Sequence, residues 1–323
     1  MPFAFRKTAI SALLATSLVL TGCAQNSEDD DAIRITGSAT VEPITRLAAT
    51  EHKAKINMTA DGTYDGFEAF CAGNSDINNA SSAITEEYIE ACEKNGVEFV
   101  ELPIGIDALS MVANRANSEV DDLSTEELKK IWEPDSQVKT WADVREGLPD
   151  EEIRLVGRPE GSGTFSYFTA MVNGEADAVR KDYEKTDSIT ELTGWVSESE
   201  YALGFMGVGN YLASDEDHRN EMNTLTVDGV EPSLGNAQDG SYPFTRPLFI
   251  YVSVDALEKK DGVEEFVTDY VENSTSIVPR VFFYGLTEDA QEAVVKRLED
   301  RETGSLFDGD PFQELDVNEE LTK

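Results

Sequence analysis

The chain has 323 residues, 40% of them hydrophobic, which is enough for two ordinary domains with separate cores. Its 64 acidic residues outnumber 26 basic ones and give a formal charge of −38. This charge excludes electrostatic binding to nucleic acid or to an anionic membrane surface, because both require a basic face. Two histidines and three cysteines leave little material for a zinc site or a histidine-based triad. We therefore expect an acidic, folded protein with no metal and no cofactor.

The first 22 residues have the pattern of a signal peptide. Arg6 and Lys7 precede an apolar run at 9–20, which is too short to span a bilayer and typical of a signal core. The run ends in L-T-G-C at 20–23, which resembles the bacterial lipobox, so we expect lipidation of Cys23. The alternative is a signal peptide that merely contains a cysteine. Residues 23–31 are polar and acidic, and are predicted to form a tether between the lipid and the fold.

The remaining cysteines are Cys71 and Cys92. An exported chain lies in an oxidising space, where paired cysteines commonly form disulfides. We therefore expect a disulfide between them, with two buried free thiols as the alternative.

Short β-rich runs alternate with helical patterns along the rest of the chain. Strands are predicted at 33–35, 56–58, 97–102, 109–113, 153–156 and 248–254. Helical spacing occurs at 43–55 and 263–271, and Ser124 and Thr287 are expected to cap two further helices. This alternation predicts an α/β fold with mostly parallel sheets. The weakly patterned residues 308–323 are expected to form a loosely packed tail.

Three segments place Gly, Ser and Thr where a strand passes into a helix, at 37–43, 61–67 and 158–165. A helix start has unpaired backbone N–H groups and the positive end of the helix dipole, and a nearby hydroxyl adds a donor. Such groups bind an oxyanion without bulk positive charge. Each segment alone is compatible with an ordinary cap and turn, but three in one chain favour an anion site. A P-loop NTPase is excluded, because no G-x-x-x-x-G-K-[ST] run is present.

These residues resemble a known family, the extracytoplasmic phosphate-binding proteins of phosphate-specific ABC importers (the PstS type). The resemblance covers nearly the whole mature chain. It is carried by T-G-S-A-T-V-E-P at 36–43, F-C-A-G-N-S-D-I-N-N-A-S-S at 70–82, L-K-K-I-W at 128–132, R-P-E-G-S-G-T-F at 158–165, A-L-G-F at 202–205 and R-P-L-F-I-Y-V at 246–252. It implies a type II periplasmic-binding-protein fold, in which the ligand cleft lies between two α/β domains joined by a two-strand hinge.

The resemblance also implies a domain division and a role. Domain 1 would comprise 32–105 and 248–323, and domain 2 would comprise 106–247, with hinge strands near 101–113 and 242–252. The protein would be a monomeric, non-enzymatic binding protein that captures inorganic phosphate and delivers it to the membrane permease subunits of an ABC importer. It would be exported and lipid-anchored, at the periplasmic face of a bacterial membrane or the outer face of the cell membrane.

The phosphate ligands of the family are carried over position by position. The matched residues are Ser38, Thr40, Val41 (through its amide), Thr63, Ser82, Arg158, Ser162, Gly163 and Thr164. Arg158 would pair with the anion, to which a planar guanidinium is well suited. Glu160 matches an acidic residue that orients this arginine. Cys71 and Cys92 fit the variant of the family that carries arginine at the position of Ser82.

Ser82 is a departure from the family pattern. Other members carry there either arginine or an aspartate, and the aspartate accepts the proton of hydrogen phosphate and so discriminates against sulfate. A serine hydroxyl can donate or accept, so binding of sulfate, molybdate or a phosphonate stays open as an alternative. Asp61, Asp65 and Glu42 are candidates for the missing acceptor.

A further alternative, from a different class, is a secreted hydrolase with Ser162 as its nucleophile. Such an enzyme needs an adjacent base and an orienting acid. Neither His52 nor His218 lies in a motif that indicates this role.

Overall fold

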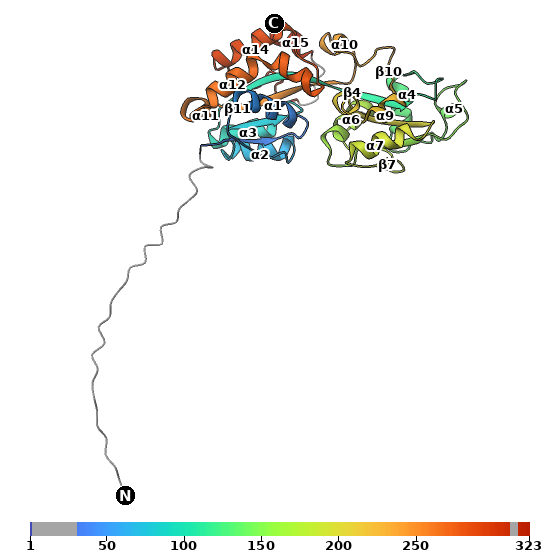
Figure 1. The fold of residues 1–323 in the computed structure, drawn as a ribbon, viewed down its shortest axis with the longest axis horizontal. Coiled ribbons are helices and arrows are strands. Elements are labelled where there is room, and N and C mark those ends of the chain that lie inside the picture. Colours follow the sequence, from blue (N-terminus) through green and yellow to red (C-terminus); the bar gives the residue numbers. More distant parts are fainter. Residues whose placement is uncertain (2–30, 311–315) are drawn as a thin grey trace.

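The computed structural model describes Met1, residues 31–310 and residues 316–323. The rest of the predicted signal peptide, Cys23 and the tether up to residue 30 lie outside the described residues. Within them, no helix combines the length and the apolar character that crossing a membrane would require. The chain forms two α/β lobes that lie side by side and are joined by two long strands (Figure 1). The predicted α/β class is confirmed.

Separate clusters of buried side chains define the two lobes. The cluster of the first lobe draws on residues between Ile33 and Ile106, and again between Ala237 and Val317. The clusters of the second lobe draw on residues between Ala108 and Phe244. The chain therefore builds part of the first lobe, crosses to build the second, and returns to complete the first.

Each lobe combines short strands with helices, and two longer strands are common to both. The first lobe contains β1 (Ile33–Gly37), α1 (Glu42–His52), β2 (Ile56–Met58), α2 (Thr63–Cys71), β3 (Ile77–Ala80), α3 (Glu86–Asn95), α10 (Leu234–Gln238), α11 (Val254–Lys259), α12 (Val263–Glu272), α13 (Ser274–Ile277), a 3-10 helix (Val278–Val281), α14 (Glu288–Glu299) and α15 (Val317–Thr322). The second contains β5 (Asp122–Leu123), α4 (Thr125–Trp132), α5 (Trp141–Val144), β6 (Arg154–Gly157), α6 (Gly163–Asn173), β7 (Glu184–Lys185), α7 (Ile189–Ser197), β8 (Ala202–Gly207), α8 (Val208–Leu212), α9 (Glu216–Asn220), β9 (Met222–Thr224) and β10 (Thr226–Val227). Two hinge strands, β4 (Phe99–Asn114) and β11 (Thr245–Ser253), cross between the lobes.

A mixed sheet runs through both lobes in the order β2-β1-β3-β11-β4-β8-β6-β7, with β9 also paired to β4. Within the lobes β1 is parallel to β2 and β3, and β6 is parallel to β7 and β8. The hinge strands pair antiparallel with each other and with β3, β8 and β9. The prediction of mostly parallel sheets is therefore wrong for the centre, because the chain crosses between the lobes in opposite directions.

The sequence pattern predicts two strands, at 97–102 and 109–113, where the structure has the single strand β4. Pro103 and Gly105 lie between those runs, and both residues usually interrupt a strand. In the structure Leu248 pairs with Gly105 and Phe249 with Pro103, so Ile104 is one extra residue on β4. This β-bulge shifts the register next to Pro103, and the strand continues beyond it to a total of 16 residues.

The predicted helix caps are present, whereas the predicted tail is not. Ser124 and Glu127 form a capping box at the start of α4, and Thr287 Oγ1 accepts from the amide of Ala290 at the start of α14. The side chain of Asn318 in α15 accepts from the Thr287 amide at 3.1 Å. Residues 316–323 thus pack onto the first lobe through buried side chains, and the expectation of a loosely packed tail is wrong there.

Candidate anion-binding site

The first helix start is a tightly packed turn between β1 and α1. Gly37 has a φ of 115°, and a Cβ there would lie 2.1 Å from the carbonyl oxygen of Asn79. The Ser38 amide donates to that carbonyl at 2.8 Å, and Ser38 Oγ accepts from the Thr40 amide at 3.2 Å. Among the described residues, neither the Thr40 hydroxyl nor the buried Val41 amide has a hydrogen-bond partner. Both are therefore available as donors.

The second helix start lies against the first. The amide of Gly62, immediately before α2, donates to the carbonyl of Gly37 at 3.0 Å. Thr63 Oγ1 accepts from the Ser81 amide at 3.1 Å and lies 3.2 Å from Ser81 Oγ. Ser81 is buried and follows β3 directly. It is a candidate site residue that is not among the predicted ligands, although it belongs to the A-S-S run that carries the family resemblance.

The third helix start comes from the second lobe. Ser162 is the N-cap of α6, and its side chain makes no capping hydrogen bond. Thr164 in the first turn is buried, whereas Gly163 is exposed. A Cβ added to Gly163 would lie 3.7 Å from Ser81 Oγ. The start of α6 therefore faces the end of β3 across the boundary between the lobes.

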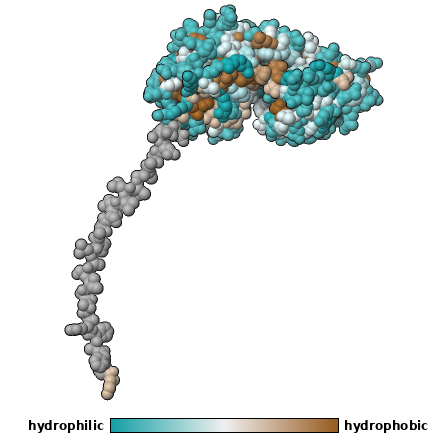
Figure 2. Space-filling view, in the orientation of Figure 1, coloured by the Kyte–Doolittle hydropathy of each residue, from teal (hydrophilic) through white to brown (hydrophobic). Residues whose placement is uncertain are grey.

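The starts of α2 and α6, which belong to different lobes, thus meet at Ser81, and the first helix start lies beside that of α2. Each helix start presents backbone N–H groups that lack partners within the helix, and the dipoles add positive potential at the same end. Serine and threonine hydroxyls lie beside them at Ser38, Thr40, Thr63 and Ser162. Figure 2 shows that the surface is hollowed where the two lobes meet. This arrangement can hold an oxyanion by hydrogen bonds alone.

Arg158 precedes the third helix start by four residues. Its side chain is 17% exposed, donates from Nη1 to the carbonyl of Asp187 at 2.6 Å, and lies 3.5 Å from the Asp187 carboxylate. Burial lowers the pKa of Arg158, and the Asp187 carboxylate opposes this effect. The described residues show no contact between Arg158 and Thr40, Thr63 or Ser81. Arg158 is therefore close to α6 in sequence. Its hydrogen-bond acceptor, Asp187, lies in the loop before α7.

Glu160 does not have the predicted partner. Its carboxylate accepts from Lys181 Nζ at 3.0 Å and lies 3.9 Å from Lys185 Nζ. The carboxylate beside Arg158 is that of Asp187, so the expectation that Glu160 orients Arg158 is corrected. The reason is local, because the turn through Gly161, with a φ of 90°, leaves Glu160 exposed to solvent.

Ser82 is half-buried, and its hydroxyl has no hydrogen-bond partner among the described residues. The three carboxylates considered as the missing acceptor do not form buried acceptors here. Glu42 accepts from Arg46 Nε at 2.6 Å, and Asp61 and Asp65 are exposed. None of the three therefore supplies a buried acceptor in the place expected for the aspartate of the family.

Neither histidine supplies a base for Ser162. His52 Nδ1 lies 3.5 Å from the carboxylate of Asp269, and His218 Nδ1 lies 3.2 Å from Thr193 Oγ1. His52 is the last residue of α1 and His218 lies in α9, and neither of these contacts involves Ser162. The part of the chain that the structure describes also has no cluster of three or more His, Cys, Asp or Glu side chains suited to a metal ion.

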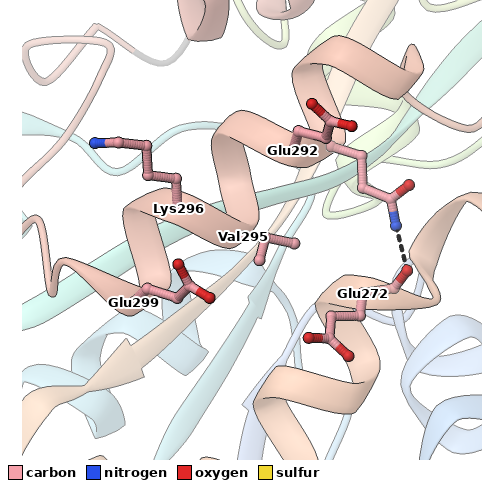
Figure 3. Close-up of a pocket in the computed structure, with 6 residues that line it drawn as sticks. Glu272, Glu292, Val295, Lys296 and Glu299 are labelled. Carbon is pink, nitrogen blue, oxygen red and sulfur yellow. Dashed lines mark hydrogen bonds between the residues drawn. The ribbon is translucent and has the colours of Figure 1, made fainter.

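Two surface pockets lie away from the helix starts. One, of about 270 Å³, lies between α12 and α14 and is lined by Glu272, Gln291, Glu292, Val295, Lys296 and Glu299 (Figure 3). The other, of about 900 Å³, contains Arg34, Asp76 and Lys260, which are already joined in ion pairs. Neither pocket includes a residue of the three helix starts, so neither coincides with the candidate anion site.

The predicted disulfide is present. Cys71, the last residue of α2, is bonded to Cys92 of α3 with an S–S distance of 2.06 Å. Both cysteines are buried in the core of the first lobe. The bond therefore ties the helix that begins at Thr63 to its neighbour.

Known proteins are similar to this chain along most of its length. A family model described as the PBP superfamily domain matches residues 24–271. Protein SphX of Synechocystis sp. is 34% identical over 309 residues, which cover 92% of this chain and 91% of that protein. The phosphate-binding protein PstS of Staphylococcus aureus (strain USA300) is 30% identical over 244 residues, which cover 73% of each chain. The crystal structure of a possible phosphate binding protein from Planctomyces limnophilus has a TM-score of 0.67 and 34% identity, and the match covers 83% of this chain and 98% of that chain.

Proposed function

This chain belongs to the PstS-type phosphate-binding proteins of the PBP superfamily, and on that premise we propose that it captures inorganic phosphate between its two lobes. It then delivers the anion to the membrane permease subunits of a phosphate ABC importer. The observation that carries the proposal is the meeting of helix starts from both lobes around Ser81. An anion held there is bound by both lobes at once, and so it stabilises the closed arrangement over an open one.

The proposed phosphate ligands are the residues of the three helix starts and their neighbours. They are Ser38, Thr40, Val41, Thr63, Ser82, Arg158, Ser162, Gly163 and Thr164, to which we add Ser81. The unpartnered Thr40 hydroxyl and Val41 amide support the first group, and the position of Gly163 opposite Ser81 supports the third. Arg158 would supply the one formal positive charge, with Asp187 as its acidic neighbour.

A formal charge of −38 does not prevent such a protein from binding an anion. Salt screens exposed charges beyond about 8 Å at physiological ionic strength, whereas aligned amides act at contact distance. The short-range donors therefore determine affinity, and the acidic surface mainly slows the approach of the anion.

We also propose the domain division 32–105 with 248–323, and 106–247, about the strands β4 and β11. The separate buried clusters support it, although Ala237 of α10 packs with the first lobe. The protein would act as a monomer outside the cytoplasm, held to the membrane by a lipid on Cys23. A family of extracytoplasmic binding proteins supports export, and radiolabelled lipid incorporation lost in Cys23→Ala would test the anchor.

Titration calorimetry on the mature protein tests the ligand. We expect tight, one-to-one binding of phosphate that sulfate, molybdate and a simple phosphonate compete for only weakly. If one of those anions binds more tightly than phosphate, that anion is the ligand instead. Sulfate is the first competitor to examine, because Ser82 stands where an acidic acceptor would discriminate against it. Absence of binding to every tetrahedral oxyanion would refute the proposal.

A further inference from the structure

A buried ion pair links the two hinge strands at the boundary between the lobes. Arg246 of β11 pairs in register with Asp107 of β4, and its Nε and Nη2 donate to the same carboxylate oxygen at 3.1 and 2.9 Å. Both side chains are buried. Burial raises the pKa of Asp107, and the adjacent guanidinium opposes the rise. On β4, Ile106 belongs to the core of the first lobe and Ala108 to the core of the second, so the pair lies at the crossing point.

The third donor of Arg246 reaches the proposed anion site. Nη1 donates to the carbonyl of Gly163, the first residue of α6, at 3.2 Å. The guanidinium also lies over the ring of Tyr167, one turn further along that helix, at 5.1 Å from the ring centre. The Tyr167 hydroxyl in turn donates to the carbonyl of Thr245, next to Arg246, at 2.5 Å. The N-terminal end of α6, from Gly163 to Tyr167, is therefore attached to the start of β11 at two points.

A guanidinium suits this position because its donors form a rigid planar fork. Two of the donors hold Asp107 while the third holds Gly163, so the orientation of α6 follows the pairing of the hinge strands. A lysine ammonium is a single point charge on a flexible stem and cannot reproduce the fork.

We propose that Arg246 is a positioning residue of the anion site, which couples the register of β4 and β11 to the direction of the N–H groups at the start of α6. This inference rests on the proposed function, since the start of α6 is an anion site only if the protein binds phosphate. Arg246 acts through Gly163, and the proposal does not require it to touch the anion.

The test compares Arg246→Lys with a matched control, Arg180→Lys. Arg180 is also buried in the second lobe, holds Asp182 with two donors, and donates from Nη1 to the carbonyls of Ile131 and Val138. Both substitutions replace a buried arginine that holds a carboxylate with two donors and a backbone carbonyl with Nη1. Only Arg246 donates to a residue of α6. Phosphate binding is measured by calorimetry, with the binding stoichiometry reporting the folded fraction, and thermal unfolding without phosphate measures stability.

We expect Arg246→Lys to weaken phosphate binding about tenfold or more at unchanged stoichiometry, because a misdirected helix start loses charge-assisted hydrogen bonds. Arg180→Lys should lower the unfolding temperature and leave the affinity within about twofold of the unsubstituted protein. If Arg246→Lys does not fold, Tyr167→Phe removes the second attachment to β11 and keeps the ring, and a measurable loss of affinity is again expected. Unchanged affinity in the folded variant, or an equal loss in Arg180→Lys, overturns the inference. Failure of the unsubstituted protein to bind phosphate overturns the proposed function instead.

Discussion

Replacement of Gly66 by alanine tests whether the packing of α2 positions the anion site. Gly66 faces the first helix start, and a Cβ there would lie 2.1 Å from Asn78 Oδ1 and 2.5 Å from Gly37 Cα. To restore even a 3.0 Å contact with Gly37, α2 must move by about 0.5 Å, and Asn78 must turn away. Overpacking of this kind costs about 1–3 kcal/mol, against which alanine recovers about 1 kcal/mol of helix propensity. We therefore expect the free energy of unfolding to fall by up to about 2 kcal/mol.

The same displacement should weaken phosphate binding. It moves Thr63 relative to Ser81 and to the first helix start, and loss of about one well-formed hydrogen bond corresponds to about tenfold in affinity. Urea denaturation and titration calorimetry measure the two effects. Gly235→Ala in α10 is the control, because a Cβ there meets no atom within 4 Å, and it should be neutral or slightly stabilising. A Gly66→Ala protein that binds phosphate normally at full stability would refute the reasoning.

Three further predictions concern the site and its scaffold. Ser81→Ala removes the hydroxyl shared with Thr63 and should weaken phosphate binding several-fold, by about 0.5–1.5 kcal/mol in a calorimetric titration; an unchanged affinity would contradict its place in the site. Arg158→Ala should weaken binding by about tenfold or more, whereas Glu160→Gln, which alters contacts with Lys181 and Lys185, should not; equal losses would restore the predicted role of Glu160. Replacing both Cys71 and Cys92 by alanine should lower the free energy of unfolding by about 3 kcal/mol, as measured in urea, and stability indifferent to the loss of the bond would contradict this.

The helix starts could be predicted because their chemistry is local. Gly37, the last residue of β1, and Gly62, directly before α2, both have positive φ, and such turns favour glycine whatever the rest of the fold. The capping box at Ser124 is likewise a pattern of four neighbouring residues. Patterns that involve only a few neighbouring residues can be recognised in the sequence, since their hydrogen bonds form within the same short segment.

The hinge strands could be predicted only in part. The run around Pro103 looks interrupted, and only the extra residue on β4, opposite the register shift in β11, shows how the strand continues. Pairing between segments about 140 residues apart also brings Arg246 to Asp107, and the sequence around each residue contains no sign of the other. Long-range register was therefore the information that the sequence lacked.

The prediction for Glu160 failed for a related reason. Proximity in sequence suggested that it would pair with Arg158, two residues earlier. The positive φ of Gly161 reverses the chain there, and exposed lysines compete for the carboxylate. Asp187 lies 29 residues beyond Arg158 and reaches it only because of the way the second lobe folds.

The described fold begins and ends in the same lobe, with β1 near one end and α15 at the other (Figure 1). The second lobe is an insertion that leaves and returns through two adjacent strands. A linker attached at either end of the fold would therefore pull on the first lobe alone. The second lobe is connected to the first only through the hinge strands, so a movement of this lobe would not change the length that the linker must span.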